Sequence, residues 1–408
     1  MCFGLSEKGR GNKDGKGEEM KVVAKTGNEA MAYAMKQIEP DVVACYPITP
    51  STEIVYSFAS FVADGEVRTE FVAVESEHSA MSACIAACAS GARAMTATSS
   101  QGLALMHEML FIASALRLPI VMAVVNRTLS APLNIHCDHS DSLASRDSGW
   151  IQLFCCNSQE AYDTLIYAVR IAEEAFLPVM VTIDGFILSH CMERIEILAD
   201  EEVKDFIKEF KPNYSLLDID HPVTVGPACL PDSYFEHKVA VAFAMRESLA
   251  IIERVSKEFG ARFGRYYPIL EGYRTEDCEV AVLAMGSTYE TATVAVDNLR
   301  EKGKKVGAYK LKLFRPFPYQ MIKEELKKVS VLGVLDRAEP LSSYGGILYT
   351  EIRAVLSEEK KKPLTASYIY GLGGREITPE DICEVFEELF RIKGKGVSPE
   401  EVSYLGVR

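Results

Sequence analysis

The feature that most constrains the fold is a regular alternation, between residues 28 and 190, of helical segments with short β-branched runs. Such an alternation is the pattern of a parallel sheet with helices on both faces, so it predicts one doubly wound α/β domain. The runs expected to be strands are Val42–Tyr46, Phe71–Val74, Ala94–Thr98, Pro119–Val125, Trp150–Cys155 and Pro178–Ile183, and the helices expected between them are Glu53–Val62, Glu77–Ser90, Leu103–Leu116 and Gln159–Phe176.

The alternation stops near His190 and resumes at Cys278, which predicts a second, smaller α/β unit. The stretch between them is rich in proline and then turns helical from His237 to Phe259, and we expect it to pack across the domains. The first residues are mostly Gly, Lys, Glu and Asp, as in disordered segments. The predicted division is a disordered leader at 1–19, the first domain at 20–190, a connecting segment at 191–274 and the second domain at 275–408.

Charge and hydropathy exclude several classes of partner. With 44 Lys and Arg against 58 Asp and Glu, the chain carries a formal charge of -14 and repels phosphate backbones and anionic lipid. Nucleic acid is therefore not an expected partner. The most apolar run, 103–125, is interrupted by His107, Glu108 and Arg117, so we expect no membrane span. The N-terminus lacks the apolar core of a signal peptide, and the expected compartment is the cytoplasm.

The cysteines and the nucleotide motifs give mainly negative information. None of the eleven cysteines belongs to a CxxC pair, the usual source of cluster and zinc ligands, so we expect free thiols. The pairs Cys84/Cys88 and Cys155/Cys156 are expected to be buried as small hydrophobic side chains. If electrons move in this system, an iron-sulfur carrier is expected on another chain. The sequence has neither GxGxxG nor GxxxxGK[ST], and Gly286-Ser287 indicates a tight turn more than an anion site.

Polar residues follow three of the expected strands, where open parallel sheets bind ligands. Thr49 lies between two prolines in Tyr46-Pro47-Ile48-Thr49-Pro50-Ser51-Thr52-Glu53, which aims its hydroxyl. A rigid turn whose Ser51 or Thr52 caps the next helix is the alternative. Glu77 opens a helix that continues with small residues, so it is either a ligand-binding carboxylate or an ordinary helix-capping one.

Arg127 provides the third signal, followed by hydroxyl residues and by Asp138-His139-Ser140-Asp141. An Arg and a hydroxyl that face one crevice can clamp a small carboxylate, although an Arg at a strand end is often only salt-bridged. The acids and the histidine have the right chemistry for a metal. No second cluster completes such a site, so no metal is expected on this chain.

Several segments resemble the α subunits of pyruvate:ferredoxin oxidoreductases. The resemblance covers nearly everything after Met20 and rests on YPITPSTE (46–53), ESEHSAM (75–81), ATSSQGLALMHE (97–108), NRTLSAPLNIHCDHSD (126–141), RDSGWIQ (146–152), LDRAEP (335–340) and GLGGREIT (371–378). It implies a thiamine-enzyme domain of the pyrimidine-binding type followed by a transketolase C-terminal-like α/β domain. The implied reaction is CoA-dependent, reversible oxidative decarboxylation of a 2-oxoacid, pyruvate first of all, with electrons passed to ferredoxin.

The resemblance also implies roles for individual residues. Glu77 would hydrogen-bond the aminopyrimidine of thiamine diphosphate as the catalytic carboxylate, Thr49 and Arg127 would hold the substrate, and Ser100, Gln101 and Asp138 would contribute to cofactor binding. The chemistry supports Glu77 independently. Thiamine catalysis needs the exocyclic amine of the pyrimidine to act as a base, and a carboxyl group at the far ring nitrogen promotes the imino form that can do so.

What the chain lacks points to partner subunits. Thiamine enzymes usually anchor the diphosphate through Mg²⁺ on a GDG segment with an Asn-rich turn, which this sequence does not contain. Asp184-Gly185 follows Ile183 and is interpreted as a turn. A β-type subunit with the diphosphate and Mg²⁺ site, further γ- and δ-type subunits, and [4Fe-4S] clusters on those partners are expected. The alternatives are another 2-oxoacid such as 2-oxoisovalerate, a thiamine-dependent component without ferredoxin, and a non-catalytic binding subunit.

Overall fold

The computed structural model describes residues 21–408, so the predicted leader at 1–19 lies outside the described residues. The first domain is built on a seven-stranded sheet in the order β12-β6-β7-β5-β4-β2-β3. Every neighbouring pair in it is parallel except β12 with β6. The strands are β2 (Val42–Cys45), β3 (Glu70–Ala73), β4 (Ala94–Thr98), β5 (Val121–Asn126), β6 (Ile151–Phe154), β7 (Val179–Asp184) and β12 (Leu313–Arg315).

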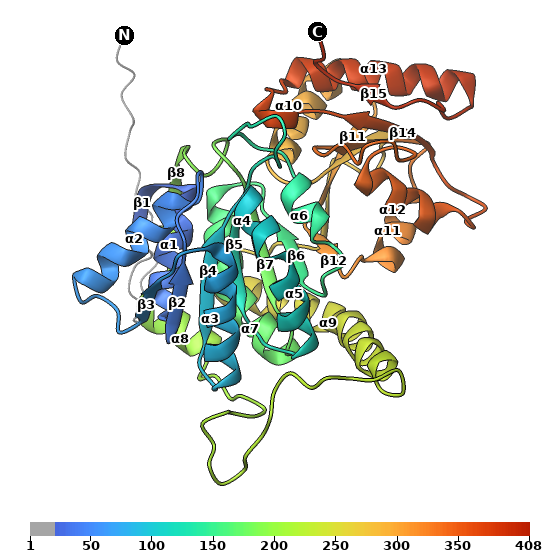
Figure 1. The fold of residues 1–408 in the computed structure, drawn as a ribbon. Helices are drawn as coiled ribbons and strands as arrows, with labels where there is room; N and C mark the ends of the chain where they lie inside the picture. Colours follow the sequence, from blue (N-terminus) through green and yellow to red (C-terminus); the bar gives the residue numbers. More distant parts are fainter. Residues whose placement is uncertain (1–20) are drawn as a thin grey trace, which may run out of the picture.

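Helices cover both faces of this sheet, which confirms the doubly wound prediction (Figure 1). Alternate residues of one strand enter different cores: Val121 and Ala123 of β5 pack with α1 and α7, whereas Met122 and Val124 pack with α3 and α5. The helices are α1 (Gly27–Ile38), α2 (Thr52–Ala63), α3 (Glu77–Ala89), α4 (Ser100–Leu105), α5 (His107–Ala115), α6 (Ser140–Ala144) and α7 (Ser158–Ala175).

One expected helix is divided in two. The sequence predicts a single helix at Leu103–Leu116, but α4 ends at Leu105 and α5 begins at His107. The division lets α4 lie against the start of α3 at Gly102, while α5 packs Leu110 onto the sheet. The prediction was wrong here because an apolar periodicity does not show where a helix must turn to follow a neighbour.

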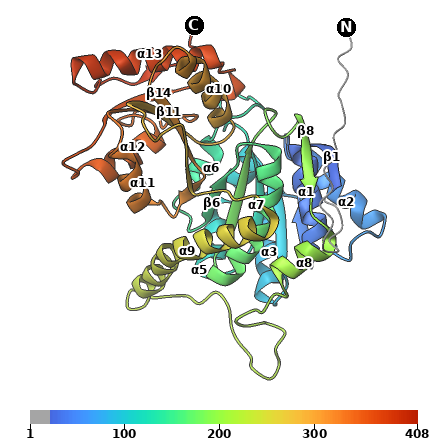
Figure 2. The same cartoon turned by 180° about the vertical axis from the view of Figure 1, so that it is seen from behind.

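The connecting segment contributes more regular structure than the sequence predicts. Its first strand, β8 (Met192–Ile197), pairs antiparallel with β1 (Lys21–Thr26) beside the first domain. After α8 (Asp200–Ile207), a long loop at 208–233 first contacts the end of α3 through Ser215 and Leu216 and then extends outward. The helix α9 (Tyr234–Phe263) follows and packs against α7 (Figure 2). The predicted helical run at His237–Phe259 lies within α9 and is confirmed.

The second domain is a smaller α/β unit with a six-stranded sheet in the order β15-β14-β13-β10-β11-β9. Its first strand, β9, precedes residue 275, so the sheet begins before the predicted domain boundary. The exact bounds of the domains stay a prediction. Its elements are β9 (Leu270–Tyr273), β10 (Val280–Ala284), α10 (Thr288–Glu301), β11 (Val306–Leu311), α11 (Tyr319–Leu326), β13 (Val331–Asp336), α12 (Ile347–Leu356), β14 (Leu364–Ile369), the 3-10 turn η1 (Leu372–Gly374), α13 (Pro379–Lys395) and β15 (Ser403–Tyr404).

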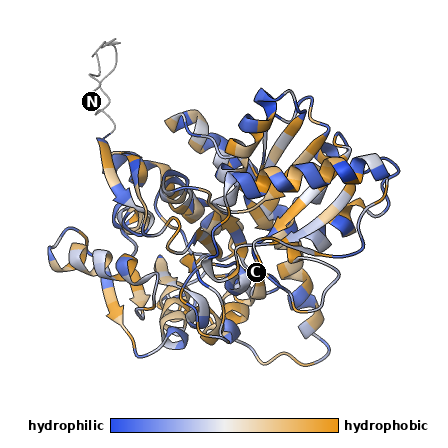
Figure 3. Ribbon diagram, turned by 90° about the horizontal axis from the view of Figure 1, so that it is seen from above, coloured by the Kyte–Doolittle hydropathy of each residue, from blue (hydrophilic) through white to orange (hydrophobic). Residues whose placement is uncertain are grey.

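The two domains are joined by strand pairing as well as by packing. After β11 the chain crosses to the first sheet, where β12 pairs with β6, so consecutive strands belong to different sheets. Orange hydrophobic residues occupy strands of both sheets in Figure 3. The thiols of Cys84, Cys88, Cys155 and Cys156 are buried and free, as predicted. Among residues 21–408, no helix has both the length and the apolar character needed to cross a bilayer.

Candidate functional site

The loop after β2 presents Thr49 at the surface of the chain. Thr49 is exposed, and its neighbour Pro50 is held by Asn28 of α1, whose Nδ2 donates to the Pro50 carbonyl at 2.8 Å. Ser51 occupies the N-cap position of α2 but does not cap it with its side chain, because its hydroxyl donates to the Ile48 carbonyl at 2.9 Å. Capping by Ser51 is therefore wrong as an explanation of this loop.

Arg127 lies beside Thr49, as the sequence predicts, but the two strand ends are not neighbours, because β4 lies between β2 and β5 in the sheet. Its Nη1 donates to the Thr49 carbonyl at 2.9 Å and its Nε to the Asn134 carbonyl at 3.2 Å. The side chain is buried, and burial lowers the pKa of its guanidinium. These two bonds use two of the five N–H donors of an arginine, and no carboxylate of residues 21–408 forms a salt bridge with it. A fixed guanidinium with free donors can receive a small carboxylate.

Glu77 is the first residue of α3 and is only 6% exposed. Capping of α3 belongs to Ser76, whose hydroxyl accepts from the Ser79 N–H at 3.2 Å. The Glu77 carboxylate has no hydrogen bond to another residue in the described part of the chain, and burial raises its pKa. It faces Gly102, where an added Cβ would lie 2.6 Å from Oε1, so a larger residue there would displace the carboxylate.

An unpartnered hydroxyl, that of Thr98, packs on Gly102 together with this carboxylate. The Thr98 hydroxyl would lie 2.5 Å from a Cβ at Gly102, so Gly102 packs against Glu77 and Thr98 together. Within the described residues, the buried hydroxyls of Thr98 and Ser99 have no hydrogen-bond partner. Buried polar groups in folded proteins are almost always paired, so a group of unpaired ones indicates a place for another molecule.

Ser100 and Gln101, predicted to contact the cofactor, connect the ends of β4 and β5. The Ser100 hydroxyl donates to the Thr128 carbonyl at 2.6 Å, and Gln101 Nε2 donates to the Ser130 hydroxyl at 2.7 Å. Ser100 is fully buried, and its polar groups are satisfied by the protein. The structure therefore brings these residues to the site through loop contacts, and their contact with a cofactor stays a prediction.

Asp138 lies apart from Glu77, on a separate cavity. Its carboxylate accepts from the Ser140 N–H at 2.9 Å. The cavity, of about 730 Å³, lies between the loop after β5 and two loops of the second domain, at 338–341 and 372–373. Neither Glu77 nor Arg127 lines it. A cofactor contact at Asp138 remains a prediction.

The sequence indicated Asp141 only as a weak candidate metal ligand, but in the structure it ties two of the site loops together. One carboxylate oxygen accepts the N–H groups of Ser100 and Arg127, both at 3.0 Å. The other accepts from Asn126 Nδ2 at 2.9 Å and from the Ser142 N–H at 2.7 Å. Burial raises the pKa of Asp141 to about 6 even against these donated bonds. Only its position in the DHSD segment could have indicated it.

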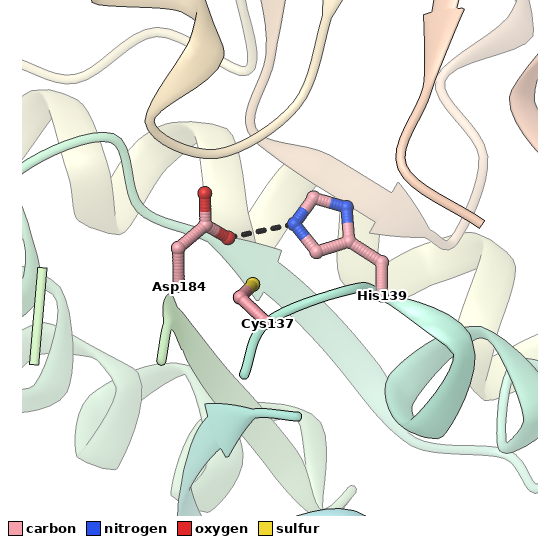
Figure 4. Close-up of side chains that lie close together, drawn as sticks. All are labelled: Cys137, His139 and Asp184. Atoms are coloured by element: carbon pink, nitrogen blue, oxygen red, sulfur yellow. Dashed lines mark hydrogen bonds and ion pairs between the residues drawn. The ribbon is translucent and has the colours of Figure 1, made fainter. Parts of the chain in front are cut away.

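A cluster of Cys137, His139 and Asp184 has the chemistry of a metal site (Figure 4). Their ligand atoms lie within 4.8 Å of one another, and His139 Nε2 is 2.7 Å from Asp184 Oδ1. However, Arg337 of the second domain donates to Asp184 at 3.1 Å and to the Cys137 sulfur at 3.8 Å. A guanidinium already supplies the positive charge, and burial raises the pKa of the Cys137 thiol well above its usual value.

This cluster is therefore a junction between the domains. Burial alone would raise the pKa of Asp184, but His139 and Arg337 hold it below its ordinary value. The Ser287 N–H also donates to Asp184 at 3.0 Å. Asp184-Gly185 lies at the end of β7 and enters a turn, as the sequence predicts, and Gly286-Ser287 contacts a carboxylate of this chain.

Comparison with known proteins assigns both domains to one family. Residues 33–257 match the family described as "Pyruvate flavodoxin/ferredoxin oxidoreductase, thiamine diP-bdg", and residues 278–382 match "Pyruvate:ferredoxin oxidoreductase core domain II". The chain is 55% identical over 388 residues to the pyruvate synthase subunit PorA of Thermotoga maritima, which covers 95% of this chain and 98% of the relative. It is 43% identical to the ketoisovalerate oxidoreductase subunit VorA of Pyrococcus horikoshii, over 93% of this chain and 96% of the relative.

Solved structures support the same fold. The 2-oxoglutarate:ferredoxin oxidoreductase from Magnetococcus marinus aligns with a TM-score of 0.70 at 22% identity, covering 90% of this chain and 65% of that chain. A split-gene transketolase aligns with a TM-score of 0.52 at 14% identity, covering 90% of this chain and 99% of the other. These likenesses bear out the predicted combination of a thiamine-enzyme domain and a transketolase-like domain.

Proposed function

The chain belongs to the pyruvate:ferredoxin oxidoreductase family and is a subunit of a 2-oxoacid:ferredoxin oxidoreductase, and we propose that it supplies one half of a shared thiamine diphosphate site. That half binds the aminopyrimidine ring and the 2-oxoacid. The proposed substrate is pyruvate, converted with coenzyme A to acetyl-CoA and CO₂ while ferredoxin accepts the electrons. Identity of 55% to the PorA subunit of Thermotoga maritima supports pyruvate, whereas the PorA and VorA subunits of Pyrococcus horikoshii, at 44% and 43%, are almost equally similar to this chain.

The observation that carries this proposal is the unpartnered carboxylate of Glu77. Burial raises its pKa, so a proton shared with a ring nitrogen is favoured over a fully ionised, buried carboxylate. Gly102 leaves room for the carboxylate, and the unpaired hydroxyls nearby offer further contacts to a polar ring. These residues fit the aminopyrimidine. When bound, thiamine diphosphate supplies the electron sink for decarboxylation, and Glu77 would hold a proton at the pyrimidine nitrogen.

Arg127 and Thr49 would bind the substrate. The Arg127 guanidinium is fixed by the Thr49 and Asn134 carbonyls, which leaves donors for the carboxylate of a 2-oxoacid. The Thr49 hydroxyl is exposed in this chain and can donate to the adjacent carbonyl oxygen of the acid. Because the carboxylate leaves as CO₂, binding it too strongly would stabilise the ground state, so we expect this pair to act mainly on KM.

The other half of the reaction is assigned to partner chains. The sequence has no GDG segment for Mg²⁺ and the diphosphate, and no CxxC pair for a cluster. We therefore place the Mg²⁺ and diphosphate site on a β-type subunit, and [4Fe-4S] clusters on that and on γ- and δ-type subunits. Coenzyme A is proposed as the cosubstrate and ferredoxin as the electron acceptor.

Native mass spectrometry of the purified complex, with iron and thiamine analysis, tests the composition. The proposal expects partner chains, iron and bound thiamine diphosphate, together with viologen reduction that requires both pyruvate and coenzyme A. Turnover without iron would favour a thiamine-dependent component without ferredoxin. Faster turnover of 2-oxoisovalerate than of pyruvate would transfer the assignment to the branched-chain acid.

A further inference from the structure

Asp141 connects the two strand ends that carry the proposed substrate and cofactor residues. The same carboxylate oxygen, Oδ2, accepts the backbone N–H groups of Arg127 after β5 and of Ser100 after β4, each at 3.0 Å. These residues are separated by a whole strand and two helices in the sequence. A single buried carboxylate thus fixes the distance between the two loops.

Helix capping does not account for this arrangement. Asp141 lies in the first turn of α6, where a carboxylate commonly accepts backbone N–H groups of its own helix. The donors from α6 itself are the N–H of Ser142 at 2.7 Å and its hydroxyl at 3.4 Å, whereas Ser100, Arg127 and Asn126 donate from outside the helix. Asp141 is 1% exposed, so these bonds form away from solvent.

Ser100 adopts a conformation that requires such support. Its φ is +45°, in the left-handed region that non-glycine residues rarely adopt. The Asp141 bond to its N–H and the bond from its hydroxyl to the Thr128 carbonyl hold it there. Strained residues persist when the surroundings determine them, and they cluster at functional sites.

The turn that carries Asp141 is anchored in its own right. The His139 N–H donates to the Arg337 carbonyl of the second domain at 2.7 Å, and the His139 side chain pairs with Asp184. The Leu143 N–H donates back to the His139 carbonyl at 3.0 Å. The carboxylate therefore has a fixed position relative to both domains.

We infer that Asp141 is a positioning residue for substrate binding: it holds the backbone of Arg127 so that the guanidinium faces the 2-oxoacid next to Thr49. The inference rests on the proposed role of Arg127. Asp141 does not touch the substrate itself. Its loss should act through Arg127, so it should raise the KM for the 2-oxoacid and spare the KM for coenzyme A.

The test is a double-mutant cycle in the assembled complex with pyruvate and viologen. Asp141→Ala should raise the KM for pyruvate about 10-fold, with less than a twofold change in the KM for coenzyme A. Asp141→Asn keeps one acceptor oxygen and should raise the KM for pyruvate only about threefold. In the double variant Asp141→Ala/Arg127→Ala, the KM should be within about twofold of Arg127→Ala alone, because the guanidinium to be positioned is already absent.

Two further variants keep the test decisive. Asn126→Ala removes one donor to Asp141 while leaving the carboxylate, and should raise the KM for pyruvate two- to threefold even if Asp141→Ala does not assemble. Asp163→Asn is the control, because Asp163 is equally buried on α7 but pairs with Arg265 and Tyr267. It should lower stability without changing either KM.

An unchanged KM for pyruvate in Asp141→Asn and Asn126→Ala would overturn the inference. So would losses in Asp141→Ala and Arg127→Ala that multiply in the double variant, since the two residues would then act independently. If Arg127→Ala itself leaves kinetics unchanged, the substrate role of Arg127 fails, and the inference fails with it.

Discussion

Two buried glutamates, each in the first turn of a helix, behave in opposite ways. Glu160 of α7 is fully buried, yet its pKa is held below its ordinary value, because Lys312 at 2.6 Å and Lys310 at 3.2 Å outweigh the effect of burial. Glu77 of α3 is also buried, but it has no cation and no donor from another described residue, and burial raises its pKa. The chain satisfies one carboxylate completely and leaves the other without a partner.

The difference in pairing indicates a structural role for Glu160 and a functional role for Glu77. Glu160 and its lysines join the first domain to the end of β11, which contains Lys310, and to Lys312 before β12, where the chain passes from one sheet to the other. Glu77 lies at the carboxyl edge of the first sheet, beside unpaired hydroxyls. An unpaired carboxylate is costly to bury, so its presence indicates that another molecule completes it.

The largest expected effect is on stability, at Glu160. Glu160→Gln should lower the free energy of unfolding by about 3 to 5 kcal/mol, because it leaves the buried Lys312 ammonium without a carboxylate and Lys310 with Glu271 alone. Urea unfolding of the purified chain measures it. Glu173→Gln is the control: Glu173 lies on the same helix, is partly exposed and, among residues 21–408, forms a salt bridge with Arg93 alone, at 2.6 Å, so the loss should be smaller. A loss of equal size in both variants would mean that the buried ion pairs of Glu160 contribute no more to stability than an ordinary salt bridge on the same helix.

The second effect is on catalysis, at Glu77. Glu77→Gln should leave assembly and unfolding nearly unchanged and should cut kcat on the order of 10²-fold, because Gln keeps the shape but cannot share a proton with a ring nitrogen. Single-turnover and steady-state kinetics of the complex with bound cofactor measure it. A change in kcat below about threefold would make Glu77 no more functional than Glu160.

The third effect is on substrate binding, at Arg127. Arg127→Ala should lower kcat/KM about 10- to 150-fold, since a hydrogen bond to a charged group contributes roughly 1.5 to 3 kcal/mol. Arg127→Lys should recover only part of this, because an ammonium lacks the planar fork of a guanidinium. Steady-state kinetics with pyruvate and 2-oxoisovalerate would show it, and unchanged values for both acids would exclude Arg127 from the site.

The smallest effect is expected at Thr49. Thr49→Val preserves the shape of the side chain and removes the hydroxyl, which should cost about 0.5 to 1.5 kcal/mol for a neutral hydrogen bond. The loss should appear in the KM for the 2-oxoacid. A loss as large as that of Arg127→Ala would mean that the valine disturbs the Thr49 carbonyl, which Arg127 needs as its acceptor.

The sequence predicted the first sheet and its helices well because residues 28–190 carry strong periodicity. It also predicted that Thr49 and Arg127 would meet, since the carboxyl ends of parallel strands lie at one edge of the sheet, but it did not predict that β4 lies between β2 and β5. It could not predict the break between α4 and α5, because the apolar periodicity does not show where a helix turns or that Gly102 packs against Glu77. The ion pair of Asp184 with Arg337 joins residues far apart in sequence, and no local pattern marks it.

Asp141 shows the same limit within the site. Its acidic neighbours suggested a metal, whereas the structure directs Asp138, His139 and Asp141 to three different partners. Spacing along the chain gives the residue types available to a site, but the direction of each side chain depends on the turn that carries it. The role of each carboxylate is therefore visible in its hydrogen-bond partners and not in its spacing along the chain.

The measurement that tests the central claim most directly is calorimetric titration of thiamine diphosphate and Mg²⁺ into the chain alone and into the assembled complex. A site with Glu77 on one chain and the diphosphate contacts on another predicts stoichiometric binding to the complex and weak or undetectable binding to the folded chain alone. Glu77→Gln in the complex should still bind the cofactor. Tight, stoichiometric binding by the chain alone would contradict the divided site.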